Sequence, residues 1–186
     1  GGLGTGGAQN ARALQAAGYS ALQFSYFRAP GQPAELVRIP IESFNAALAW
    51  LKSRPEVDPT RIGVVGVSKG VEAALLLATH NPEIDVVVAG TPSSVIWPGF
   101  SWSGSQVSGS SWTVRGRDVP ALPFGRADGF MDVGSLYGNG LKAAAARPRS
   151  AIEIEKANAK VLLVCGEADA LWPACTMARQ LKRRAP

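Results

Sequence analysis

The pentapeptide GVSKG at residues 66–70 constrains the fold more than any other part of the sequence. An apolar run over residues 61–67 leads into it, and residues 69–79 follow with the pattern of a helix. A strand that passes directly into a helix around a serine needs a very tight turn, so the residues two positions before and after the serine must be small. The pattern therefore predicts that Gly66 and Gly70 flank a strained turn from which the Ser68 hydroxyl projects.

The rest of the chain alternates between strand and helix patterns. Strands are expected at residues 21–27, 61–67, 84–89 and 160–166, and helices at 8–17, 41–53, 69–79, 139–147 and 173–184. This alternation predicts the α/β class, with a mostly parallel sheet and helices on both of its faces. Together with the serine turn it is typical of an α/β-hydrolase, in which such a turn is the nucleophile elbow.

The length of 186 residues fits one domain, which we expect to span residues 1–186. Residues 99–127 differ from the rest because they are rich in Ser, Gly, Pro and Trp and have no sustained period. We interpret them as an irregular, cap-like excursion, since long loops in a compact domain are often functional. Two alternatives stay open: the excursion covers an active site, or it is a surface loop without a catalytic role.

The elbow predicts the roles of two neighbouring residues. Ser68 is the expected nucleophile, and the backbone N–H of Lys69 is expected to point to where an oxyanion would form. The Lys69 ammonium is given no role, because the side chain that follows the nucleophile points away from it. The glycine-rich residues 1–7 stand where the fold takes its second oxyanion donor, so Gly2 or Leu3 is the candidate for it.

A nucleophilic serine also needs a base and an acid that orients the base. In this fold the acid follows a later strand, and the apolar residues 161–166 are followed by Glu167 and Asp169. Asp169 is the predicted acid, and Glu167 is its competitor. The alternative for Asp169 is an exposed loop carboxylate or a cap on the following helix.

The sequence contains no histidine at a position that suits the catalytic base. His80 is the one histidine of the sequence, and it stands 12 residues after Ser68 at the far end of the expected helix. That separation corresponds to roughly 18 Å, so His80 is expected to be a surface residue rather than the base. We expect the histidine beyond Pro186 and a further strand before Gly1, so that this part of the domain is inactive alone.

Composition excludes several other classes of function. The net charge is +5 but no basic stripe alternates with aromatic residues, so no nucleic-acid partner is expected. No apolar run approaches the roughly 18 residues of a membrane span. The glycine match within residues 1–7 has no preceding strand, so we predict no cofactor, and we predict no metal. Cys165 and Cys175 are expected to be unpaired core thiols, which suits a reducing, cytoplasmic location.

Longer motifs make the interpretation more specific. The stretch VSKGVE begins at residue 67, SSVIW at residue 93, SWTVRG at residue 111, and GEADALWP at residue 166. Together these resemble the C-terminal catalytic domain shared by acyl-CoA thioesterases and bile acid-CoA:amino acid N-acyltransferases. The resemblance implies that Ser68 accepts the acyl group and that Asp169 is the acid. Because the amide-forming members tend to carry cysteine as nucleophile, the serine favours hydrolysis of an acyl-CoA thioester.

Two other functions stay open at this point. The same triad cleaves oxygen esters, so the substrate could be another small acyl ester, as in a dienelactone-type hydrolase. The missing histidine is also consistent with a non-catalytic acyl-binding module.

Overall fold

The computed structural model describes residues 5–101, 108–129, 132–144 and 149–186. Its main sheet has three parallel strands in the order β2-β3-β6. These are β2 (Ile62–Val67), β3 (Ile84–Gly90) and β6 (Lys160–Val164). The prediction of a mixed α/β protein is therefore confirmed, and three of the four predicted strands pair in parallel.

A second, smaller sheet was not predicted. It contains β1 (Ile39–Pro40), β4 (Trp112–Val114) and β5 (Arg117–Asp118), with β1 parallel and β5 antiparallel to β4. Two of these strands lie inside the 99–127 segment, which is therefore partly regular. Trp112, in the middle of that segment, is fully buried.

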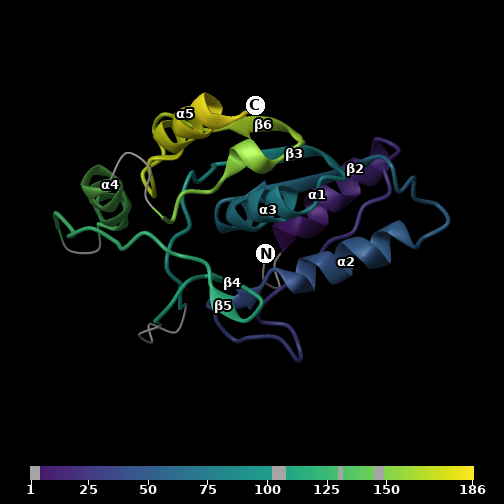
Figure 1. Ribbon diagram of the computed structural model, residues 1–186, viewed down its shortest axis with the longest axis horizontal. Helices are drawn as coiled ribbons and strands as arrows, with labels where there is room; N and C mark the ends of the chain where they lie inside the picture. The colour runs from purple at the N-terminus through teal and green to yellow at the C-terminus, as the bar shows by residue number, and fades with distance from the viewer. Residues whose placement is uncertain (1–4, 102–107, 130–131, 145–148) are drawn as a thin grey trace.

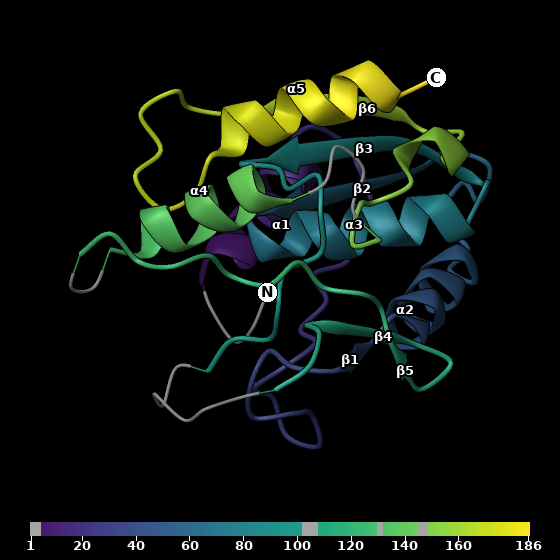
Figure 2. The same ribbon diagram turned by 60° about the vertical axis from the view of Figure 1, so that its left-hand side comes forward.

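Four of the five helices follow the predicted spans within a few residues, whereas the helix predicted at 139–147 begins six residues earlier, at Val133. They are α1 (Thr5–Ala16), α2 (Glu42–Lys52), α3 (Lys69–His80), α4 (Val133–Ala143) and α5 (Ala174–Arg184), with a 3₁₀ turn at Ile154–Lys156. Helix α3 lies between the main sheet and the small sheet (Figures 1 and 2). This position explains its sequence, because all residues from 71 to 78 are buried and only an apolar helix tolerates that. None of the described helices is long and apolar enough to cross a membrane.

The two faces of the main sheet differ. Helix α3 covers one face, where Val87 and Ala89 are fully buried. On the other face five apolar side chains are 40–57% exposed: Val65, Val67, Val86, Leu162 and Val164. The expected helices on both faces are thus not found among the described residues, because α3 and α5 pack on the same side of the sheet. The uncovered face leaves a large apolar surface in water.

The predicted strand at residues 21–27 is wrong. Residues 19–26 have no strand assignment, although Tyr26 and Phe27 are buried. The Tyr26 ring packs 5.0 Å from Phe44 and 5.5 Å from Trp112. The apolar pattern of this segment therefore comes from aromatic packing in the core, which short apolar runs do not distinguish from β pairing.

The two cysteines correct a further expectation. Cys165 at the end of β6 and Cys175 in the first turn of α5 form a disulfide, with their Cα atoms 5.3 Å apart. This Cα distance lies within the usual range for a disulfide, although the two cysteines are ten residues apart in the sequence. The prediction of unpaired thiols is wrong, so the cysteines no longer support the expected cytoplasmic location.

Candidate active site

Ser68 occupies the strained turn that the sequence predicts. It lies between β2 and α3 with φ 54° and ψ −127°, a backbone conformation that is unfavourable for a residue with a side chain. Its N–H lies 2.9 Å from the carbonyl oxygen of Gly90 and 3.1 Å from Thr91 Oγ1. These bonds tie the turn to the end of β3, and the Ser68 side chain remains partly exposed. The local geometry is that of a nucleophile elbow.

The two glycines of the motif have different roles. A Cβ atom on Gly66 would lie 2.6 Å from the carbonyl oxygen of Gly70, so the strand and the helix cross too closely for any side chain there. A Cβ atom on Gly70 would meet only the Tyr26 hydroxyl, at 3.6 Å, which is an ordinary contact. Gly66 is therefore required by the turn, whereas the expected need for a small residue at position 70 is not a steric one.

The first turn of α3 presents backbone donors next to Ser68. The N–H groups of Lys69 and Gly70 have no acceptor among the described residues, as is usual for the first residues of a helix. An anion near the Ser68 hydroxyl would meet these donors and the positive end of the helix dipole. The predicted partners Gly2 and Leu3 lie outside the described residues.

The Lys69 side chain turns into the protein and pairs with Glu72. Its Nζ lies 2.8 Å from Glu72 Oε1 and 2.9 Å from Oε2, and it donates to the carbonyl oxygen of Trp97 at 3.2 Å. Burial lowers the pKa of Lys69 and raises the pKa of Glu72, which is completely buried. The ammonium is thus held by contacts inside the protein, and the absence of a catalytic role for it stays a prediction.

Glu72 is the residue that sequence reasoning missed. Its Oε2 accepts hydrogen bonds from Trp112 Nε1 at 2.8 Å and from the N–H of Trp97 at 3.3 Å, besides the bond from Lys69. Glu72 therefore connects the segments around Trp97 and Trp112 to the first turn of α3, which begins directly after Ser68. The spacing of Lys69 and Glu72, three residues apart on a helix otherwise apolar, was the available signal.

Asp169 lies in the loop between β6 and α5, which the disulfide closes. Its Oδ1 accepts from the N–H of Leu171 at 2.9 Å and from that of Trp172 at 3.3 Å. Both bonds fix the carboxylate, and Oδ2 has no donor among the described residues. The side chain does not cap α5, which begins only at Ala174. It is an oriented, partly buried acid with one oxygen available.

Glu167, the competing acid, points elsewhere. Its carboxylate pairs with Arg179 of α5 at 2.9 Å, and 75% of its side chain is exposed. Such a pair on the surface stabilises little.

Ser68 and Asp169 are brought to the same edge of the sheet. Each follows the carboxyl end of a parallel strand, and only β3 lies between β2 and β6. Neighbouring strands are about 4.8 Å apart, so the ends of β2 and β6 are separated by roughly 10 Å. His80 is not at this edge: it is the exposed last residue of α3, and its Nδ1 contacts the carbonyl oxygen of Leu76 at 2.8 Å.

An aromatic cluster adjoins the Asp169 loop. The Tyr137 ring of α4 packs edge-on against Trp97 at 4.8 Å, Phe124 at 5.1 Å and Trp172 at 5.4 Å. Burial raises the pKa of Tyr137 to about 12, so its hydroxyl stays neutral. No group of three metal-ligating side chains occurs in the described part of the chain.

Comparison with known proteins assigns the family. The family model described as BAAT / Acyl-CoA thioester hydrolase C terminal matches residues 39–185. Acyl-coenzyme A thioesterase 1 of Homo sapiens is 25% identical over 98% of this chain and 42% of its own length. Acyl-coenzyme A thioesterase 3 of Mus musculus is 26% identical over 92% of this chain and 38% of its own length. The chain thus spans about two fifths of the length of these relatives. Since the family model covers most of the sequence, the chain belongs to the BAAT / acyl-CoA thioester hydrolase C-terminal family.

Proposed function

We propose that this chain is the nucleophile-bearing part of an α/β-hydrolase domain that cleaves acyl-CoA thioesters to a free acid and CoA. The observation that carries the proposal is the strained backbone of Ser68 at the turn from β2 into α3. A strained residue of this kind persists only where the surrounding structure fixes it, and such strain concentrates at active sites. The family of the chain supplies the class of substrate.

The proposed reaction uses a serine, a histidine and an acid. Ser68 Oγ attacks the thioester carbonyl carbon while a histidine takes its proton, and the oxyanion is stabilised by the Lys69 N–H together with a donor from Gly2 or Leu3. The carbon–sulfur bond then breaks, and the histidine returns the proton to the CoA thiolate. Water, activated by the same histidine, attacks the acyl-serine and releases the acid. Asp169 orients the histidine and stabilises its charged form.

The histidine of this scheme is not His80. We propose that it comes from sequence that follows residue 186, as part of a domain larger than these residues. The open sheet supports a larger domain, because neither β2 nor β6 has a neighbour on its outer edge among the described strands. The exposed valines of the uncovered face likewise fit a sheet that further segments complete.

The substrate is tested by comparing two kinds of ester in a chain extended through the sequence after residue 186. Release of CoA thiol from palmitoyl-CoA and release of p-nitrophenol from p-nitrophenyl esters are measured for the wild type, Ser68→Ala and Ser53→Ala. Ser53 is an exposed serine at the end of α2 and serves as the matched control. We expect thioester turnover that Ser68→Ala abolishes and Ser53→Ala preserves. Turnover of oxygen esters alone would refute the substrate class.

A further inference from the structure

A cavity of about 570 Å³ lies at the opposite end of α3 from Ser68. Its walls are the last turn of α3, the β4-β5 hairpin and residues 149–153. The wall residues of α3, Leu76 to His80, stand 8 to 12 residues after Ser68. At the rise of an α-helix this is roughly 12–18 Å, so the cavity is separate from the serine turn.

The charges around this cavity are not balanced within the protein. The wall carries two carboxylates, and each is already paired with a cation from outside the wall: Asp118 with Arg38, and Glu153 with Lys156 at 2.6 Å. The wall also carries Arg117 and Arg149, and neither forms an ion pair with a described residue. Two exposed guanidinium groups without an ion-pair partner in the described part of the chain therefore border the cavity.

A buried hydroxyl in the wall also lacks a partner. Ser150 is 4% exposed, and its Oγ has no hydrogen-bond partner among the residues that the structure describes. A buried polar group without a partner is rare in proteins and needs an explanation, such as a bound water or ion. Because Ser150 lines the cavity, a ligand bound there would supply the missing partner.

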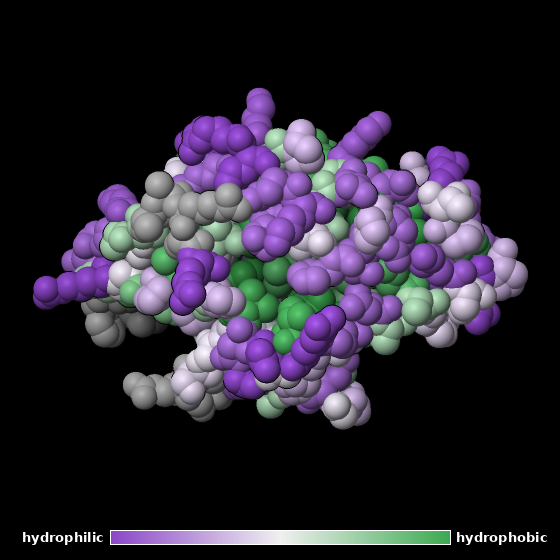
Figure 3. Space-filling model, viewed as in Figure 1, coloured by the Kyte–Doolittle hydropathy of each residue, from purple (hydrophilic) through white to green (hydrophobic). Residues whose placement is uncertain are grey.

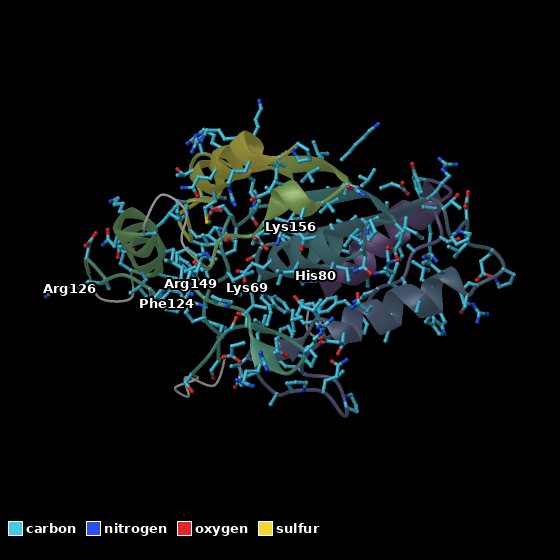
Figure 4. The ribbon with its side chains drawn as sticks, in the orientation of Figure 1. Lys69, His80, Phe124, Arg126, Arg149 and Lys156 are labelled. Carbon is cyan, nitrogen blue, oxygen red and sulfur yellow. A yellow bond between two sulfur atoms is a disulfide. The ribbon has the colours of Figure 1, made fainter. Side chains whose placement is uncertain are left out.

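The remaining wall is largely apolar. Side chains of Leu76, Ile96, Val114, Val119 and Ile152 contribute to it. Figure 3 shows apolar surface near the centre of the view with hydrophilic residues around it, and Figure 4, in the same orientation, labels the wall residues His80 and Arg149. The volume lies within the roughly 300–1,000 Å³ that small-molecule sites occupy, and such sites combine apolar walls with a few polar groups.

We propose that this cavity binds a small amphipathic anion, with its carboxylate or phosphate held by Arg117 and Arg149 and its apolar body against the aliphatic wall. Guanidinium groups match both kinds of head group, because each presents parallel N–H donors to two oxygens. The Ser150 hydroxyl supplies a further donor. The proposal does not depend on the reaction at Ser68, since binding is measured directly.

The test is isothermal titration calorimetry of the full chain with four probes. Octanoate and octyl phosphate carry both a head and a tail, whereas octanol lacks the charge and inorganic phosphate lacks the tail. We expect saturable binding of at least one octyl anion, and the tighter of the two identifies the head group. Arg117→Gln and Arg149→Gln should each weaken that binding about tenfold, as loss of a charge-assisted hydrogen bond does.

Two control variants make the result decisive. Arg183→Gln removes an exposed charge at the end of α5, and Ser68→Ala alters the serine turn, so both should bind the octyl anion as the wild type does. The proposal is overturned if neither octyl anion binds, if octanol binds as tightly, or if Arg183→Gln weakens binding as much as the two wall variants. Loss of binding in Ser68→Ala would place the ligand at the serine turn and would also overturn it.

Discussion

Gly66→Ala should destabilise the protein much more than Gly70→Ala, although both glycines belong to the same motif. An alanine Cβ at position 66 would lie 2.6 Å from the Gly70 carbonyl oxygen, 2.8 Å from the Gly70 carbonyl carbon and 3.0 Å from Val71 Cα. All three are backbone atoms, so the strand and the helix must separate by about 0.8 Å to reach an ordinary contact of 3.4 Å. Overpacking of this kind costs about 1–3 kcal/mol.

Gly70→Ala should be neutral or stabilising. The new methyl group meets only the Tyr26 hydroxyl at 3.6 Å, and alanine in a helix is more favourable than glycine by about 1 kcal/mol. The two variants should therefore differ by roughly 2–4 kcal/mol, which corresponds to about 1 M or more in the midpoint of urea unfolding. Gly63→Ala is the control in the same strand, since its Cβ would approach nothing closer than 3.7 Å.

The assay is urea unfolding of the full chain, followed by tryptophan fluorescence and circular dichroism. Equal midpoints for Gly66→Ala and Gly63→Ala would refute the argument that the strand and the helix cross in close contact at Gly66. If Gly70→Ala lowered the free energy of unfolding as much as Gly66→Ala, the conclusion that position 70 has room for a methyl group would be wrong.

Three further predictions concern the core and the loop of the acid. Burial raises the pKa of Glu72 above its ordinary 4.5, so just above that pH the folded protein keeps a proton on Glu72 that the unfolded protein has released. The contribution of Glu72 to the free energy of unfolding therefore falls as the pH rises above about 4.5. Glu72→Gln should remove that fall in urea titrations between pH 4.5 and 7, and a parallel pH dependence in both proteins would contradict it. Leu75→Ala should cost about 2–5 kcal/mol because Leu75 is fully buried, whereas Leu162→Ala on the open face should cost less than about 1 kcal/mol in the same assay. Reduction of the disulfide, or Cys175→Ser, should lower stability by roughly 2–3 kcal/mol for its short loop, and a maleimide probe should find reactive thiols in the unfolded protein only after reduction.

The sequence predicts local elements here better than their assembly. The helices and the strands β2, β3 and β6 carry strong apolar periodicity, so their spans agree with the structure within a few residues, apart from α4, which begins at Val133. Residues 21–27 fail because the same apolar run serves aromatic packing around Tyr26. The short strands β1, β4 and β5 have two or three residues each, too few to produce a periodic signal.

The candidate site shows the same division. Ser68 and its backbone strain follow from the motif, because a strand can turn into a helix so sharply in very few ways. The pairing of Cys165 with Cys175 and the buried contacts of Glu72 depend on how the β6-α5 loop and the tryptophan segments fold back, which is a tertiary property. Local spacing gave a hint of the ion pair but none of the hydrogen bonds that surround it.

Covalent labelling with a fluorophosphonate tests whether Ser68 is an activated nucleophile. The protein, extended through the sequence after residue 186, is treated with the reagent and its intact mass is measured beside Ser68→Ala and Ser53→Ala. We expect a single adduct on the wild type and on Ser53→Ala, and none on Ser68→Ala. A folded wild type that takes up no label, or an adduct that persists in Ser68→Ala, would contradict it.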